Sequence, residues 1–121
     1  MSRVQLAAKQ IEEAFSSHKF ELTYAYLSDD VRWDNVGGEQ IHGKDRVIHT
    51  CEQSAQYLAT VTTKFSKFKT MVGENCVVID GTANYIDADN NVFTVASCDI
   101  YQFTEGKVSE ITSYTVELNK H

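Results

Sequence analysis

The chain of 121 residues has no proline, one tryptophan and three cysteines, and it is short of basic residues. Its 11 lysines and arginines are outnumbered by 17 aspartates and glutamates, which gives a formal net charge of −6. Since no basic stripe interrupts this excess of acid, we expect neither a nucleic-acid partner nor a membrane partner. The sequence also lacks a long apolar run, so we expect no signal peptide, no transmembrane helix and a cytoplasmic location.

The cysteines and the other chemistry-bearing residues are widely scattered. Cys51, Cys76 and Cys98 are odd in number and form no C-x-x-C pair, which excludes a disulfide framework and indicates a reducing compartment. No cluster has the spacing of metal ligands, and the chain lacks a nucleophile elbow and a phosphate-binding glycine loop. We therefore expect no metal and no cofactor.

What the sequence does contain is the composition of one folded domain, with 42% hydrophobic and 23% charged residues over positions 1–121. Apolar residues recur at helical spacing over residues 4–17, 19–27 and 44–59, which predicts three helices with one apolar face each. Ser28 and the two aspartates that follow favour a turn, because their side chains bond local backbone, and they should end the second helix.

The remaining segments alternate with a period of two and predict strands. A short strand at 31–36 ends in a turn at Gly37 and Gly38. Four longer strands are expected, at residues 60–72, 76–87, 92–104 and 107–118. Helices followed by consecutive hairpins indicate the α+β class. We expect a cone-like single domain in which a curved, mostly antiparallel sheet holds three helices on its concave side, with a ligand pocket in its mouth.

Three segments resemble the nuclear-transport-factor-2-like superfamily, including its SnoaL-like and ketosteroid-isomerase-like members. They are residues 26–30 (YLSDD) before the first strand, residues 34–43 (DNVGGEQIHG), and residues 98–103 (CDIYQF) with 105–108 (EGKV). The resemblance covers nearly the whole chain and implies a single domain of that fold. It leaves the chemistry open, because this scaffold hosts isomerases, dehydratases, cyclases and non-enzymes.

By position, the resemblance implies two catalytic aspartates. Asp34 matches the proton-shuttling base of ketosteroid isomerases, and Asp99 matches their second aspartate, which stays protonated and donates a hydrogen bond to the oxyanion. The position of the isomerases' oxyanion-hole tyrosine is occupied here by Ile11. That departure puts steroid isomerase activity in doubt and leaves open which side chain replaces the tyrosine, among Tyr24, Tyr26, Tyr57 and Tyr101.

The residues themselves allow other interpretations of the two aspartates. Asp99 lies in the middle of a strand with apolar neighbours on both faces, which is out of place unless something pairs with it. It could face a pocket, or it could be structural and pair with Arg32, Lys67 or a backbone group. Asp34 could face the same pocket, or it could bond backbone N–H groups in the glycine turn.

Aromatic and imidazole side chains near these aspartates are candidates for substrate binding, although each is also a plausible core or surface residue. They are Trp33, Tyr24, Tyr57, Tyr101 and His42. Two of the other histidines carry no functional prediction, since His18 falls in a turn and His49 on the polar face of the helix at 44–59.

Two hypotheses of function follow. The first is a lyase or isomerase that performs cofactor-free acid–base chemistry on a small hydrophobic carbonyl compound, with Asp34 as the base and Asp99 as the hydrogen-bond donor. The second is a non-catalytic ligand-binding or dimerisation module. We also expect a homodimer through the outer face of the sheet, where Val78, Thr82 and Ile86 or their alternates are exposed.

Overall fold

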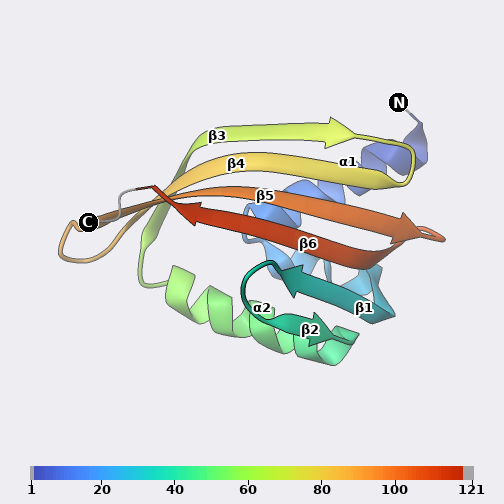
Figure 1. Cartoon of the computed structure of the whole chain (residues 1–121), viewed down its shortest axis with the longest axis horizontal. Coiled ribbons are helices and arrows are strands. Elements are labelled where there is room, and N and C mark those ends of the chain that lie inside the picture. Colours follow the sequence, from blue (N-terminus) through green and yellow to red (C-terminus); the bar gives the residue numbers. More distant parts are fainter. Residues whose placement is uncertain (1, 119–121) are drawn as a thin grey trace.

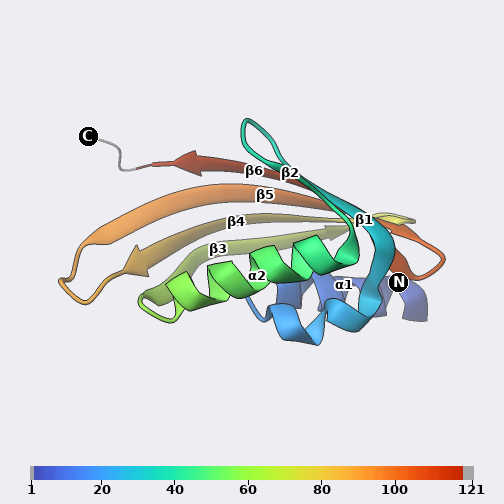
Figure 2. The ribbon, with the colours of Figure 1, turned by 90° about the horizontal axis from the view of Figure 1, so that it is seen from below.

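The computed structural model describes residues 2–118, which contain two α-helices and one six-stranded sheet. The sheet curves over both helices, which lie together on its concave side (Figures 1 and 2). The helices are α1 (Arg3–Ser16) and α2 (Lys44–Leu58). The strands are β1 (Leu27–Asn35), β2 (Gln40–His42), β3 (Thr62–Val72), β4 (Cys76–Ile86), β5 (Val92–Thr104) and β6 (Lys107–Glu117). The predicted α+β class is confirmed.

The strand order is β2-β1-β6-β5-β4-β3. Every neighbouring pair is antiparallel except β1 and β6, which are parallel. Consecutive hairpins join β3 to β6, whereas β1 reaches β6 from the other end of the chain. This one long-range pairing brings the N-terminal third of the chain to the edge of the C-terminal meander.

The prediction of three helices was wrong. Residues 19–27 form two short 3₁₀ turns, Phe20–Leu22 and Tyr24–Tyr26, and then enter β1. Thr23 holds this conformation, since its buried hydroxyl donates a 2.6 Å hydrogen bond to the Phe20 carbonyl and its own carbonyl accepts from the Tyr26 N–H. A side chain that bonds the backbone within one turn competes with a continuous α-helix.

The short strand β2 was also missing from the sequence prediction. The chain turns at Gly37, whose φ of +82° suits glycine, and Ile41 then pairs with Trp33 across a hairpin. Its three residues are too few to show an alternation in sequence. Ile41 is buried, so β2 closes one edge of the core beside α2.

The core lies between the helices and the concave face of the sheet. Its most deeply buried large side chains come from every layer, and they include Leu27, Val31, Ile41, Val47, Ile79, Tyr101, Val108 and Ile111. On β4 the buried residues Val77, Ile79 and Ala83 alternate with outward-facing Val78 and Thr82. No helix in the described part of the chain is both long and apolar enough to span a membrane.

Candidate functional site

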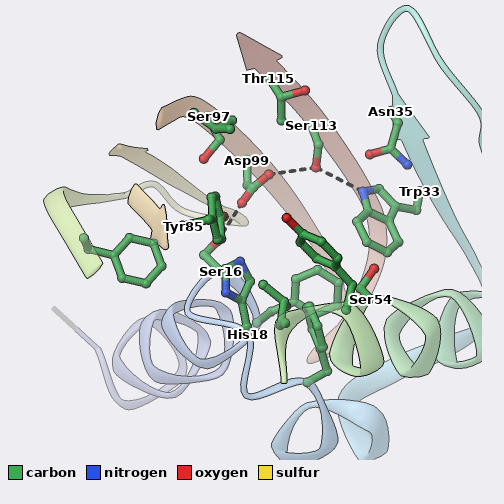
Figure 3. A pocket seen from close by; sticks show the side chains of 16 residues that line it. Ser16, His18, Trp33, Asn35, Ser54, Tyr85, Ser97, Asp99, Ser113 and Thr115 are labelled. Atoms are coloured by element: carbon green, nitrogen blue, oxygen red, sulfur yellow. Dashed lines mark hydrogen bonds between the residues drawn. The ribbon is translucent and has the colours of Figure 1, made fainter. Parts of the chain in front are cut away.

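A cavity of about 340 Å³ opens on the concave side of the sheet, beside the end of α1 and the second half of α2. Aromatic and aliphatic side chains form most of its wall, including Phe15, Phe20, Trp33, Leu58, Phe65 and Val95. Polar and titratable groups interrupt this wall, namely Ser16, His18, Asn35, Ser54, Tyr57, Tyr85, Ser97, Asp99, Ser113 and Thr115. Figure 3 shows these polar side chains converging on the cavity from the sheet, α1 and α2.

The period-two alternation of each strand selects which side chains reach the cavity. On β5 it directs Ser97 and Asp99 inward, and on β6 it directs Ser113 and Thr115 inward. Asp99 is opposite Ser113 in the β5–β6 register, so its carboxylate meets a hydroxyl from the neighbouring strand.

Asp99 accepts a hydrogen bond on each carboxylate oxygen. Ser16 Oγ donates to Oδ2 at 2.8 Å, and Ser113 Oγ donates to Oδ1 at 2.7 Å (Figure 3). Because one donor is on α1 and the other on β6, the helix and the sheet together fix the orientation of the carboxylate. The ion pairs considered for Asp99 are not formed. Lys67 pairs with Asp80 at 2.7 Å on the other face of the sheet, and alternation along β1 places Arg32, next to Trp33, on that other face as well.

Each serine is in turn hydrogen-bonded to a second donor. Trp33 Nε1 donates to Ser113 Oγ at 3.0 Å, and since an indole N–H can only donate, the Ser113 proton is left for Asp99. The Tyr101 hydroxyl lies 2.6 Å from Ser16 Oγ. With the Ser16 proton directed to Asp99, Tyr101 acts as the donor to Ser16. Asp99 is therefore the acceptor at the end of two chains of hydrogen bonds, one from Trp33 and one from Tyr101.

Asp34 does not line this cavity. Its neighbours Trp33 and Asn35 do, and alternation along β1 then places Asp34 on the opposite face, where it pairs in register with Gln40 and Thr112. The expectation that Asp34 and Asp99 face one pocket is therefore wrong.

The five predicted substrate-binding residues divide into three groups. Trp33 and Tyr57 line the cavity. Tyr101 is fully buried behind it and contacts it through Ser16. Tyr24 and His42 line separate surface depressions, so the structure does not bring them to this site. Ile11, the position matched to the isomerases' tyrosine, is also absent from the wall, in which the tyrosines are Tyr57 and Tyr85.

The sequence predicted no functional role for two residues of this region, His18 and Glu12. His18 lines the cavity, and burial lowers the pKa of its imidazole although the Asp99 charge opposes this effect. Glu12 is 1% exposed and its Oε2 has no hydrogen-bond partner within residues 2–118; burial, reinforced by Asp99, holds its pKa well above the ordinary range. Glu12 precedes Ser16 by one helical turn, which is a sequence signal for a shared face.

Burial also raises the pKa of the tyrosine hydroxyls at the site. Tyr85 in the wall shows this effect, with a further contribution from Asp99. Tyr101 shows a stronger rise in pKa, because desolvation and the charges of Asp99 and Glu12 all favour the neutral hydroxyl and outweigh the opposing effect of its hydrogen bond to Ser16. Both hydroxyls keep their protons at neutral pH and remain available as donors. The described residues include no group of three or more His, Cys, Asp or Glu side chains that could hold a metal ion.

Comparison with known proteins identifies the family. A SnoaL-like domain model matches residues 8–111. The chain belongs to the SnoaL-like domain family. The resemblance found in the sequence is thereby confirmed, and 8–111 includes α2 and the first five strands together with parts of α1 and β6.

Solved structures agree with this assignment. An NTF2-like protein of unknown function from Cytophaga hutchinsonii is 29% identical, with a TM-score of 0.83 over 93% of this chain and 99% of that chain. A candidate polyketide cyclase from Xanthomonas campestris is 14% identical, with a TM-score of 0.71 over 92% and 91%.

A candidate ketosteroid isomerase from Kribbella flavida is 15% identical, with a TM-score of 0.67 over 98% of this chain and 81% of that chain. At these identities the cyclase and the isomerase show the shared fold alone. No curated protein sequence matched the chain.

Proposed function

We propose that this SnoaL-like protein is a small enzyme that performs acid–base chemistry on a hydrophobic carbonyl compound, with Asp99 as the general base. One observation carries the proposal: an acidic side chain, oriented by two hydroxyl donors, faces a cavity whose wall is mostly apolar. A carboxylate in such a site can abstract a proton from the carbon next to a carbonyl group.

The proposed step needs only side chains. Asp99 takes the proton, the electron pair of the C–H bond forms a carbon–carbon double bond, and negative charge develops on the carbonyl oxygen. Hydroxyl and amide groups in the wall, among them Ser97, Asn35 and Thr115, are available to donate to that oxygen. Return of the proton to a different carbon completes an isomerisation. In a dehydration the C–O bond of a neighbouring hydroxyl breaks instead, and the hydroxyl takes the proton from Asp99 and leaves as water.

The roles differ from those implied by the family resemblance. Asp34 is replaced as the base by Asp99, because Asp34 is outside the cavity. In this proposal Asp99 acts as the base and not as the hydrogen-bond donor of the isomerases, which is supported by the Trp33 and Tyr101 chains of hydrogen bonds that both end on it.

The test is exchange of deuterium into a panel of hydrophobic ketones, with 2-tetralone as the first member, followed by proton NMR in D₂O. We expect Asp99→Asn to slow the protein-catalysed exchange by about 100-fold or more, as loss of a general base does. Asp34→Asn is the matched control and should leave exchange unchanged. Equal exchange in wild type and Asp99→Asn would exclude the enzyme, and binding of the ketone without exchange would favour the non-catalytic module.

A further inference from the structure

His18 occupies a left-handed backbone position, where glycine is the usual residue. It follows the last turn of α1, and its φ is +72°. Its N–H donates to the Phe15 carbonyl at 3.0 Å, and the N–H of Lys19 donates to the Ala14 carbonyl at 2.8 Å. This pair of bonds is the Schellman motif, whose left-handed position is usually glycine and sometimes asparagine. A β-carbon there is strained, and such residues concentrate at functional sites.

The strained backbone places the imidazole in the cavity wall. The ring lies 5.8 Å from the ring of Phe20, 5.7 Å from that of Phe65 and 6.0 Å from that of Tyr85, measured between centroids. Three aromatic neighbours fix the ring, and Figure 3 shows it on the same wall as Tyr85 and Asp99. Since burial lowers the pKa of His18, the imidazole is neutral at neutral pH and carries one N–H donor.

No other histidine in the part of the chain that the structure describes combines these features. His42 and His49 are exposed and lie outside the cavity. Within residues 2–118 the His18 side chain makes no hydrogen bond, whereas its neighbours Ser16 and Asp99 both do. A neutral imidazole in an apolar wall, close enough to Asp99 for their charges to interact, is therefore available to a bound molecule.

We propose that His18 is a second catalytic residue, which donates a hydrogen bond to the carbonyl oxygen of the substrate while Asp99 removes the neighbouring proton. This inference rests on the proposed function and defines its substrate more narrowly. The oxygen must lie at the His18 corner, whose walls are the rings of Phe20, Phe65 and Tyr85, and the acidic carbon must face Asp99. An aryl or conjugated ketone has the flat, apolar surface that fits these rings.

The step balances without a further reactant. The proton passes from the substrate carbon to Asp99, the C–H electron pair becomes the enolate double bond, and the charge rests on the oxygen that accepts from the His18 N–H. His18 keeps its proton throughout. Asp99 then returns its proton to a carbon of the same conjugated system, which restores the carboxylate and the neutral imidazole.

The test uses His18→Gly, which suits the left-handed backbone and removes the donor, with His49→Ala on the exposed face of α2 as the control. We expect His18→Gly to slow exchange of 2-tetralone at least about tenfold in kcat, since one lost donor to a developing oxyanion has effects of this order or larger. Free imidazole added to His18→Gly should restore part of the rate. If His18 had only a structural role, free imidazole would not restore the exchange rate of the variant. Circular dichroism verifies that the variant is folded.

A second measurement on the wild type keeps the proposal falsifiable if His18→Gly fails to fold. With ¹⁵N-labelled histidine, the ring nitrogen signals of His18 should move when 2-tetralone binds, and those of His49 should not. Unmoved His18 signals in a protein that binds the ketone would overturn the proposal, as would full exchange in His18→Gly. If Asp99→Asn abolishes exchange that His18→Gly retains, only the role of His18 fails. Equal exchange in wild type and Asp99→Asn would remove the proposed function as well.

Discussion

Tyr101 is electrostatically coupled to two carboxyl groups that differ in their surroundings. Asp99 is half-buried at the cavity and accepts two hydrogen bonds, whereas Glu12 is buried in the core and its Oε2 is unpaired within the described residues. The sequence predicted one acid kept neutral by its environment beside one that ionises. In the structure the acid whose surroundings favour the neutral form is Glu12, because desolvation and the Asp99 charge both raise the pKa of Glu12.

The raised pKa of Glu12 predicts a pH-dependent stability. Below the unfolded pKa of about 4.5, Glu12 is protonated in both states and its contribution is fully present. As the pH rises toward the folded pKa, the unfolded chain ionises first, so the free energy of unfolding falls by up to about 1.4 kcal/mol per pH unit. We expect Glu12→Gln to remove this loss, so that the stability of the variant relative to wild type increases as the pH rises above about 4.5.

Urea denaturation across this pH range measures the effect of Glu12→Gln. Glu52→Gln changes the same type of side chain on the exposed surface of α2 and serves as the control. Parallel stability curves for wild type and Glu12→Gln would show that Glu12 is ionised in the folded protein.

Among the elements, α2 depends on an unusual backbone at its start. Gly43 precedes the helix with φ +93° and ψ 147°, its N–H donates to Val31, and its carbonyl accepts from Val47. A β-carbon at this position would meet no atom within 4 Å. Any loss of stability on substitution of Gly43 therefore comes from backbone strain alone, because this conformation is almost restricted to glycine.

We expect Gly43→Ala to lower the free energy of unfolding by about 1–3 kcal/mol. Gly38→Ala is the matched control in the neighbouring turn, because Gly38 has no positive φ and its β-carbon would make ordinary contacts, the nearest at 3.5 Å from the Asn35 carbonyl oxygen. Chemical denaturation of the two variants compares them directly. An equal loss in both would mean that strain at Gly43 is not the cause.

For the whole molecule, the convex face of the sheet remains open. Outward-facing Met71, Tyr114 and Val116 are 42%, 47% and 59% exposed. The outward residues of β4 include Val78, Thr82 and Ile86, as the sequence predicted, and also Asp80 in its ion pair with Lys67. Exposed apolar side chains gathered on one face are typical of protein–protein contacts. We propose that two copies associate through this face and leave both cavities accessible on the concave side.

Sedimentation velocity tests the dimer. We expect Val116→Lys to weaken association at least about tenfold, because a lysine in a buried apolar interface costs more than about 1.4 kcal/mol. Val4→Lys changes an exposed valine on α1 and should have no effect. A wild type that sediments as a monomer, or a dimer insensitive to Val116→Lys, would contradict the proposal.

Local patterns in the sequence determined most of the fold. The helical period predicted the bounds of α1 and α2 to within about two residues, and the period of two predicted β3 to β6. Three short segments indicated the family. These features could be predicted because each depends on contacts between residues that are close in sequence, or on turn residues such as Gly37 and Gly106 with positive φ.

The tertiary structure alone decided the composition of the site. Alternation divides β1 into two faces, but only the pairing of β1 with β6 shows that Trp33 and Asn35 face the cavity and Asp34 does not. The end of α1 similarly brings Ser16 to Asp99, 83 residues away in sequence, and turns His18 into the wall. Such contacts depend on how distant elements pack, and no local preference of a single residue specifies them.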